Sequence, residues 1–122
     1  MSEKLKALRG ATNLTEDSKN EIDAKTEELI GELIKQNDLA YEDMVCVVFS
    51  LTSDITAAYP AATFRNKFVS CVPLFSCLEP NIQGGMPLTI RVMILHYGKK
   101  NNPVYLHETK NLRKDLFYEH CN

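Results

Sequence analysis

The spacing of apolar residues along the chain predicts two helices and about five strands. The clearest helix spans residues 15–37, where mainly apolar side chains recur at helical intervals on one face. Ser18 followed by Glu21 fits a capping box at its start, and Thr15 is an alternative cap for an earlier first turn. The predicted buried face consists of Ile22, Thr26, Leu29, Ile30, Leu33 and Ile34.

Five other segments have the pattern of strands. The first ends at Gly10, and the third contains Pro73, which is typical of an edge strand or a bulge. The fourth and fifth are separated by the polar turn 98–102, so we expect them to form a hairpin. A second helix is expected over residues 60–68, because proline is favoured at a first helical position and Pro60 occupies it. The predicted strands span residues 4–9, 44–51, 70–79, 87–97 and 103–108.

This order of elements predicts one α/β domain over residues 1–122, with a tail from about residue 114 that is expected to be flexible. Two helices can cover only one face of a five-stranded sheet. Residues 44–51 and 88–95 are nevertheless apolar on both faces. The uncovered face must therefore pack on something, and a symmetric homo-oligomer is the simplest answer.

Composition and charge exclude several classes of protein. The 122 residues include 44% hydrophobic and 25% charged residues, as in ordinary globular proteins, and the net charge of -2 argues against a nucleic-acid partner. No apolar run suggests a secretory signal or a membrane span, so we expect a cytoplasmic protein that does not bind membranes. The four cysteines include no CxxC pair, and we expect them to be small buried hydrophobes without disulfides.

Motifs for covalent, metal or nucleotide chemistry are missing from the sequence. There is no GxSxG elbow, P-loop or GxGxxG turn, and the three histidines lack the spacing of metal ligands. We therefore expect no metal and no cofactor. His96 and His107 are interpreted as surface side chains rather than catalytic ones.

A cation in an apolar strand is the most informative feature of the chain. Arg91 lies within "LTIRVMIL", and an arginine buried without an anionic partner would cost several kcal/mol, roughly, even after the protein relaxes. Glu79 precedes the loop that leads into this strand, so the two side chains can meet. A carboxylate beside several guanidiniums, with no nucleophile, is typical of a site that binds a small polyanion bearing a hydroxyl.

Four segments carry a family resemblance. The stretches "LRGATN", "YPAATFR", "VPLFSCLEPNIQGGMPLTIRVMI" and "VYLHETKNLRKDL" resemble, in order and spacing, the monofunctional chorismate mutases of the trimeric pseudo-α/β-barrel class. The resemblance runs from about residue 8 to residue 116. It implies a mixed five-stranded sheet with two helices on one face, assembled as a homotrimer with active sites between subunits.

The resemblance also implies an activity, the conversion of chorismate to prephenate on the route to phenylalanine and tyrosine. This reaction is an intramolecular pericyclic rearrangement in which one C–O bond breaks while one C–C bond forms. It needs no nucleophile and no proton transfer. The enzyme has to hold the folded conformer and stabilise negative charge on the ether oxygen, which suits arginine.

The resemblance also assigns a role to each position of this sequence that matches a site residue of the family. Arg91 matches the donor to the ether oxygen and a carboxylate, Glu79 the acceptor of the ring hydroxyl, and Arg9 the arginine that binds a carboxylate. The other matching positions fall into three groups. The pocket lining is expected from Phe75, Ser76, Cys77, Leu78 and Tyr105, the neighbouring chain's contribution from Tyr59, Ala61 and Arg65, and the entrance cover from Leu112 and Arg113.

Some positions depart from the family pattern. Ala62 stands where a lysine is frequent, which should weaken the attraction of the substrate and raise KM more than it lowers the chemical rate. Lys114 replaces the proline of "LRPD", and Ser76 replaces a frequent cysteine but can still form a hydrogen bond. Two alternatives stay open: a trimeric imine deaminase of the Rid type, and a carboxylate-metabolite binding protein without catalytic activity.

Overall fold

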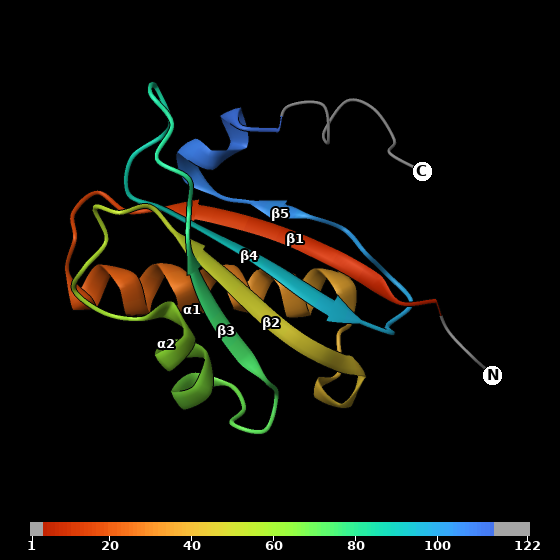
Figure 1. The fold of residues 1–122 in the computed structure, drawn as a ribbon. Coiled ribbons are helices and arrows are strands. Elements are labelled where there is room, and N and C mark those ends of the chain that lie inside the picture. Colours follow the sequence, from red (N-terminus) through yellow and green to blue (C-terminus); the bar gives the residue numbers. More distant parts are fainter. Residues whose placement is uncertain (1–3, 114–122) are drawn as a thin grey trace.

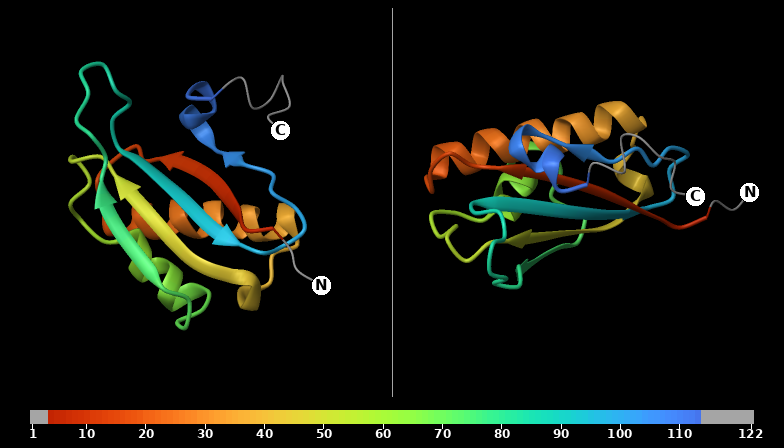
Figure 2. Two further views of the ribbon diagram at one scale, coloured as in Figure 1. Left: turned by 45° about the vertical axis from the view of Figure 1, so that its right-hand side comes forward. Right: turned by 90° about the horizontal axis from the view of Figure 1, so that it is seen from above.

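A computed structural model describes residues 4–113, which form one mixed sheet with two helices on one of its faces (Figures 1 and 2). The sheet has the strand order β3-β2-β4-β1-β5, which confirms the predicted five strands. Among the described residues, no helix has the length and apolarity that a membrane span requires. The elements are β1 (Lys6–Asn13), α1 (Lys19–Asn37), η1 (Tyr41–Asp43), β2 (Met44–Leu51), α2 (Pro60–Lys67), β3 (Leu74–Leu78), β4 (Thr89–His96), β5 (Val104–Tyr105) and η2 (His107–Asn111).

Strand β4 is the middle of the sheet. It pairs antiparallel with β1 on one side and with β2 on the other, while β5 and β3 add parallel at the two edges. Its alternate residues Ile90, Val92 and Ile94 are buried, whereas Arg91 and Met93 are partly or largely exposed on the opposite face. This is the alternation predicted from the sequence, and it leaves one face of the sheet without a helix over it (Figure 2).

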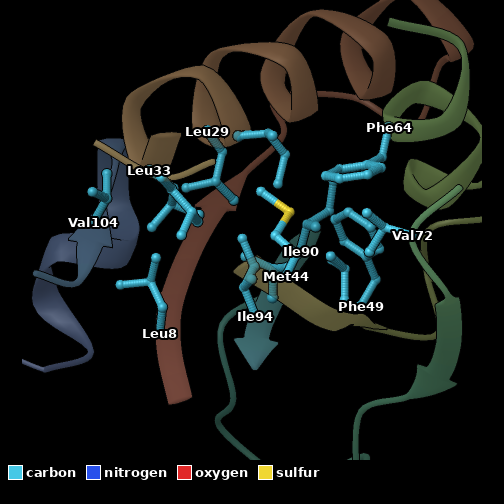
Figure 3. Close-up of a cluster of buried hydrophobic side chains, with 14 of the residues drawn as sticks. Leu8, Leu29, Leu33, Met44, Phe49, Phe64, Val72, Ile90, Ile94 and Val104 are labelled. Carbon is cyan, nitrogen blue, oxygen red and sulfur yellow. The ribbon is translucent and has the colours of Figure 1, made fainter. Parts of the chain in front are cut away.

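The hydrophobic core fills the layer between the sheet and the two helices (Figure 3). Leu29 and Leu33 of α1 point into it from the helix side, and Ile90 points into it from β4. The rings of Phe49 in β2 and Phe64 in α2 meet edge to face, with their centroids 6.5 Å apart. Each such buried side chain contributes about 1.5–3 kcal/mol relative to an exposed one, so this layer fastens the sheet to the helices on the side away from the open face.

The helix α1 begins after the predicted cap residue, but one of the two hydrogen bonds of the expected capping box has a different donor. The side chain of Ser18 accepts a hydrogen bond from the backbone N–H of Glu21 at 3.2 Å, and the helix begins at Lys19. The Glu21 carboxylate accepts from the backbone N–H of Thr15 at 2.9 Å instead of turning back to Ser18. This hydrogen bond from Thr15 lowers the pKa of Glu21 below its usual value. The backbone of Thr15 is therefore bonded to a side chain of the helix, but the N-cap residue is Ser18 and not Thr15.

The first strand continues through Gly10, so the expected end at that residue is wrong. A Cβ at Gly10 would lie 2.9 Å from Leu33 Cδ1 and 3.2 Å from the backbone oxygen of Val104. Glycine is present because α1 and β5 approach the strand closely here, and glycine is tolerated within a strand for such contacts. One consequence is that Arg9 lies within β1 and not at its end.

The expected hairpin between the last two strands is also wrong, because β5 pairs with β1. Both edges of β4 are already occupied, by β1 and by β2. The connecting turn is instead held against the end of α1, where the buried side chain of Asn37 accepts from Asn102 N at 2.5 Å and donates to Asn102 O at 3.1 Å. The chain then crosses to the free edge of β1, and Leu106 N donates to Ala11 O at 2.9 Å.

The burial of three side chains differs from what the sequence predicted. His96 is fully buried and not on the surface: its Nδ1 accepts from Gly98 N at 3.0 Å, and its Nε2 lies 3.0 Å from Asn101 Oδ1. Cys71 and Cys77 are exposed and not buried, because Cys71 lies in the connection between α2 and β3 and Cys77 lies in the edge strand β3. His107 is exposed, as predicted.

Candidate active site

A pocket of about 420 Å³ is formed on the sheet, and residues from all five strands contribute to its lining. The strand register explains why these residues meet. Ser50 of β2 is opposite Arg91 of β4 and Cys77 of β3, while Arg9 of β1 is opposite Met93. Strand alternation therefore puts these side chains on the face that no helix covers. The lining consists of Arg9, Gly10, Val48, Ser50, Cys77, Leu78, Glu79, Pro80, Arg91, Val92, Met93 and Tyr105.

The centre of the pocket is an ion pair between Arg91 and Glu79. Arg91 Nε lies 3.4 Å from Glu79 Oε1, and the two side chains are 41% and 20% exposed. The backbone of Glu79 is held in place because its N–H donates to Leu51 O at 2.8 Å. Among the described residues, Arg91 Nε is buried without a hydrogen-bond partner of good geometry, so the pair is a loose contact. The guanidinium is therefore available to a further anion.

Arg9 and Tyr105 complete the wall of the pocket on the side of β1 and β5. Arg9 is half-buried and Tyr105 is 5% exposed. Tyr105 is opposite Ala11, and Ala11 is opposite Arg91, which places Tyr105 on the same face as the ion pair. The pocket thus offers two guanidiniums and one carboxylate.

Two residues of β3 predicted to line the pocket do not contribute to it in the single chain. Phe75 shares the open face but is 65% exposed and lies outside the lining, whereas Cys77, Leu78 and Glu79 contribute to it. Ser76 is opposite Phe49, whose side chain is buried in the core, so Ser76 is on the helix side of the sheet. In this chain the contribution of β3 therefore begins at Cys77.

Another group of predicted residues, around the start of α2, does not reach the pocket. Tyr59 is 68% exposed, Arg65 is exposed, and Ala61 packs partly against the core. Tyr59 caps α2 and the other two residues lie in it, and α2 packs on the helix-covered face of the sheet (Figure 1). The side chain of Arg91 is on the opposite face. In one chain these residues and Arg91 therefore cannot touch the same small ligand.

The loop before α2 has its own anchor at the start of α1. The carboxylate of Asp17 accepts from Thr56 N and Ala57 N at 3.0 Å and from Thr56 Oγ1 at 2.6 Å. These hydrogen bonds, led by the one from the Thr56 hydroxyl, lower the pKa of Asp17 below its usual value. The loop that presents Tyr59 is therefore attached to the fold by an ionised carboxylate.

The segment with Leu112 and Arg113 follows a turn that is attached to β1. Both residues are half-buried and follow the η2 turn, but they are not part of the lining. Two hydrogen bonds fix η2 to β1: Thr109 Oγ1 donates to Ala11 O at 3.0 Å, and Glu108 N donates to Asn13 Oδ1 at 2.9 Å. The remaining tail, including Lys114, lies outside the described residues.

Ser50 is a pocket residue that the sequence interpretation missed. It is a hydroxyl in the apolar run of β2, and this is the same kind of signal that drew attention to Arg91 in β4. Val48 and Met93 were missed for a different reason, because apolar residues of a central strand give no sign of the face to which they belong.

The arrangement suits binding and polarisation of an anionic molecule. Its arginines can donate to carboxylate or ether oxygens, and its carboxylate can accept from a hydroxyl. The thiol of Cys77 donates to Phe49 O, 3.5 Å away, and therefore points toward the backbone. Within residues 4–113 there is no group of three or more His, Cys, Asp or Glu side chains placed to hold a metal ion.

Comparisons with known proteins agree with this chemistry. The chain is 34% identical over 119 residues to the chorismate mutase AroH of Thermus thermophilus, covering 92% of this chain and 96% of the relative. It is 32% identical over 117 residues to the chorismate mutase AroH of Bacillus subtilis, covering 92% of each chain. The solved structure of a chorismate mutase from Clostridium thermocellum superimposes with a TM-score of 0.84 at 32% identity, covering 87% of this chain and 98% of that one.

A family model covers nearly the same range. The model of chorismate mutase type I matches residues 5–116, which include every strand and helix described above. The matched range also contains both members of the ion pair, Glu79 and Arg91. The chain therefore belongs to the chorismate mutase type I family of enzymes.

Proposed function

We propose that the pocket on the open face of the sheet converts chorismate to prephenate, in the biosynthesis of phenylalanine and tyrosine. The observation that carries this proposal is the Arg91–Glu79 pair, set in a pocket that also contains Arg9. Such a pocket can bind a dicarboxylate that bears a hydroxyl and an ether oxygen. The rearrangement is intramolecular, so the protein needs to supply only orientation and electrostatic stabilisation.

Arg91 stabilises the transition state in this mechanism. Negative charge develops on the ether oxygen as the C–O bond breaks, and the guanidinium donates to that oxygen and to a nearby carboxylate. An arginine is suited to this task because it stays charged and its donors have a fixed planar geometry. The partly buried position of Arg91 strengthens the interaction, because water screens it less there than on the surface.

Glu79 and Arg9 hold the two ends of the folded substrate. Glu79 accepts from the ring hydroxyl and offsets part of the positive charge, while Arg9 binds a carboxylate. Cys77, Leu78 and Tyr105 confine the substrate from the sides. Of the other positions carried over from the family, Phe75 is exposed beside the pocket and Ser76 is turned away from it.

A homotrimer would bring the remaining residues to the site. The sheet face that carries the pocket has no helix over it, and it exposes apolar side chains that include Phe75 and Met93. Packing on a neighbouring subunit would bury these side chains. It would also allow the neighbour's copies of Tyr59, Ala61 and Arg65 to close the pocket, with Leu112 and Arg113 of the same chain over the entrance.

Mixing two inactive variants tests whether subunits share the site. Arg91→Ala and Arg65→Ala each damage a different half of a shared site, so mixed trimers should contain some sites with both arginines intact. We expect partial recovery of chorismate turnover after the two variants are unfolded together and refolded. Each variant treated alone is the control, and no recovery in trimers shown to be mixed would contradict a shared site.

The two alternative functions predict different outcomes with the purified protein. A chorismate mutase consumes chorismate and releases prephenate. An imine deaminase releases ammonia from an imine and leaves chorismate unchanged, whereas a binding protein holds chorismate without converting it. Chorismate consumption, followed by ultraviolet absorbance together with a binding isotherm, therefore separates all three, and binding without turnover would overturn the proposal.

A further inference from the structure

Ser50 lines the pocket, and the mechanism proposed for the reaction gives it no role. It faces Arg91 across the β2–β4 pairing and Cys77 across the β2–β3 pairing. Its neighbours along β2 are apolar, so a hydroxyl at this position is an exception within the strand. The hydroxyl is half-buried and needs a hydrogen-bond partner, and the identity of this partner indicates the role of Ser50.

The hydroxyl of Ser50 donates to Oε1 of Glu79. This is the same carboxylate oxygen that lies 3.4 Å from Arg91 Nε. A serine hydroxyl has one proton to donate, so its donor capacity is spent on Glu79. Oε1 therefore faces the protein, with Ser50 on one side and Arg91 on the other.

The other carboxylate oxygen of Glu79 has a different environment. Within residues 4–113, no hydrogen bond is donated to Oε2, and the ion pair with Arg91 is measured at Oε1. The backbone of Glu79 is fixed by Leu51 O and Oε1 is fixed by Ser50, so the direction of Oε2 is set by both ends of the residue. Oε2 is consequently the oxygen left to accept a hydrogen bond from a ligand in the pocket.

Arginine and carboxylate have a strong tendency to form a two-pronged pair, in which two parallel N–H groups donate to both oxygens. Such a pair between Arg91 and Glu79 would occupy the guanidinium N–H groups that should donate to the substrate. It would also occupy the carboxylate oxygen that should accept from the substrate hydroxyl. In the structure no hydrogen bond joins the two side chains, Nε lies 3.4 Å from Oε1, and the Ser50 hydroxyl donates to that same Oε1.

We propose that Ser50 is a positioning residue that keeps Glu79 from closing onto Arg91. By holding Oε1, it directs Oε2 toward the substrate hydroxyl and leaves the outer guanidinium nitrogens of Arg91 for the ether oxygen and carboxylate. The kinetic part of this inference rests on the proposed function. Ser50 does not touch reacting atoms, and its effect on the reaction passes through Glu79.

Two variants at this position test the role. Ser50→Ala removes the donor, and we expect kcat to fall about 10-fold or more, with a smaller change in KM, because a hydrogen bond to a charged group is lost. Ser50→Thr keeps a hydroxyl and suits a strand, so it should restore most of the activity. A Ser50→Ala enzyme with wild-type kcat, or a Ser50→Thr enzyme as impaired as Ser50→Ala, would overturn the proposal.

A double-mutant cycle with Glu79→Ala, which leaves Ser50 no side-chain acceptor at this position, separates positioning from a purely structural role. If Ser50 acts through Glu79, Ser50→Ala should change kcat less than about 2-fold once Glu79 is replaced, because interacting residues are non-additive. Equal losses from Ser50→Ala in both backgrounds would mean that it acts independently of Glu79, and the proposal would fail. The midpoint of thermal unfolding should stay within a few degrees of wild type in every member of the cycle.

Crystal structures of the variants give a readout that needs no turnover. In Ser50→Ala the Glu79 carboxylate should rotate into a two-pronged contact with Arg91, and in Ser50→Thr it should stay in place. If the wild-type protein fails to convert chorismate while Glu79 still rotates in Ser50→Ala, the proposed function is wrong and the positioning role stands. An unmoved carboxylate in Ser50→Ala would contradict the positioning role whatever the activity.

Discussion

Replacing Arg91 with alanine should lower kcat for chorismate by at least about 100- to 1,000-fold. The basis is the loss of a donor aimed at charge that develops only in the transition state, which typically costs about 3–4 kcal/mol. Arg91 is partly exposed and lies on the open face of β4, so its removal should leave the core intact. Steady-state kinetics by loss of chorismate absorbance measures the effect, with circular dichroism to verify the fold.

Arg91→Lys is the matched control for this prediction. Lysine keeps the positive charge but lacks the planar fork that reaches two oxygens at once, so we expect most of the loss in kcat to persist. Recovery of most of the activity in Arg91→Lys would mean that charge alone is sufficient. Near-normal turnover in Arg91→Ala would remove Arg91 from the mechanism.

Replacing Glu79 with glutamine should lower kcat/KM by about 10- to 100-fold. Glutamine preserves the shape of the side chain but removes the charge, and hydrogen bonds to charged groups contribute about 1.5–3 kcal/mol. The neutral amide also leaves the guanidiniums of Arg91 and Arg9 without a compensating anion. Separate values of kcat and KM from initial rates over a range of chorismate concentrations measure the loss.

Glu79→Asp gives the corresponding control. It keeps the charge but shortens the reach, so it should break the contact with Ser50 while preserving charge balance in the pocket. If the position of the carboxylate matters, Glu79→Asp should be impaired as well. Wild-type kinetics in Glu79→Gln would show that the hydroxyl of the substrate is recognised elsewhere.

The sequence predicted the parts of the fold that are set by local periodicity. The alternation around Arg91 identified both faces of β4, and Ser18 marked the start of α1, because side-chain spacing and capping are local properties. The strand Met44–Leu51 has the predicted bounds. Local signals were sufficient at these positions because the tertiary structure agrees with them.

The features that were mispredicted depend on contacts between distant segments. Gly10 has the local sequence signal of a strand end, but glycine is required there because α1 packs closely on the strand. The hairpin does not form because both edges of β4 are paired, with β1 and with β2. His96 is buried because the turn that follows it folds back onto its ring. Each of these depends on contacts that periodicity along the chain does not encode.

The residues of the candidate site also fall into those that local sequence could identify and those that depend on distant contacts. Arg91 stood out because a cation in an apolar strand conflicts with its surroundings, and Glu79 could be linked to it by the short loop between them. Ser50 could not be linked to Glu79 from the sequence, because the parallel pairing of β2 with β3 brings them together. The roles of Tyr59, Ala61 and Arg65 depend on a second chain and stay predictions.

The central claim is that the pocket accelerates the rearrangement by binding and electrostatics alone, without proton transfer or a covalent intermediate. Incubating the purified protein with chorismate in D2O and following the reaction by NMR tests it most directly. We predict that chorismate is replaced one for one by prephenate that carries no solvent deuterium on its ring carbons, at nearly the rate found in H2O. Deuterium on the ring carbons, or chorismate that is bound but not converted, would contradict the account.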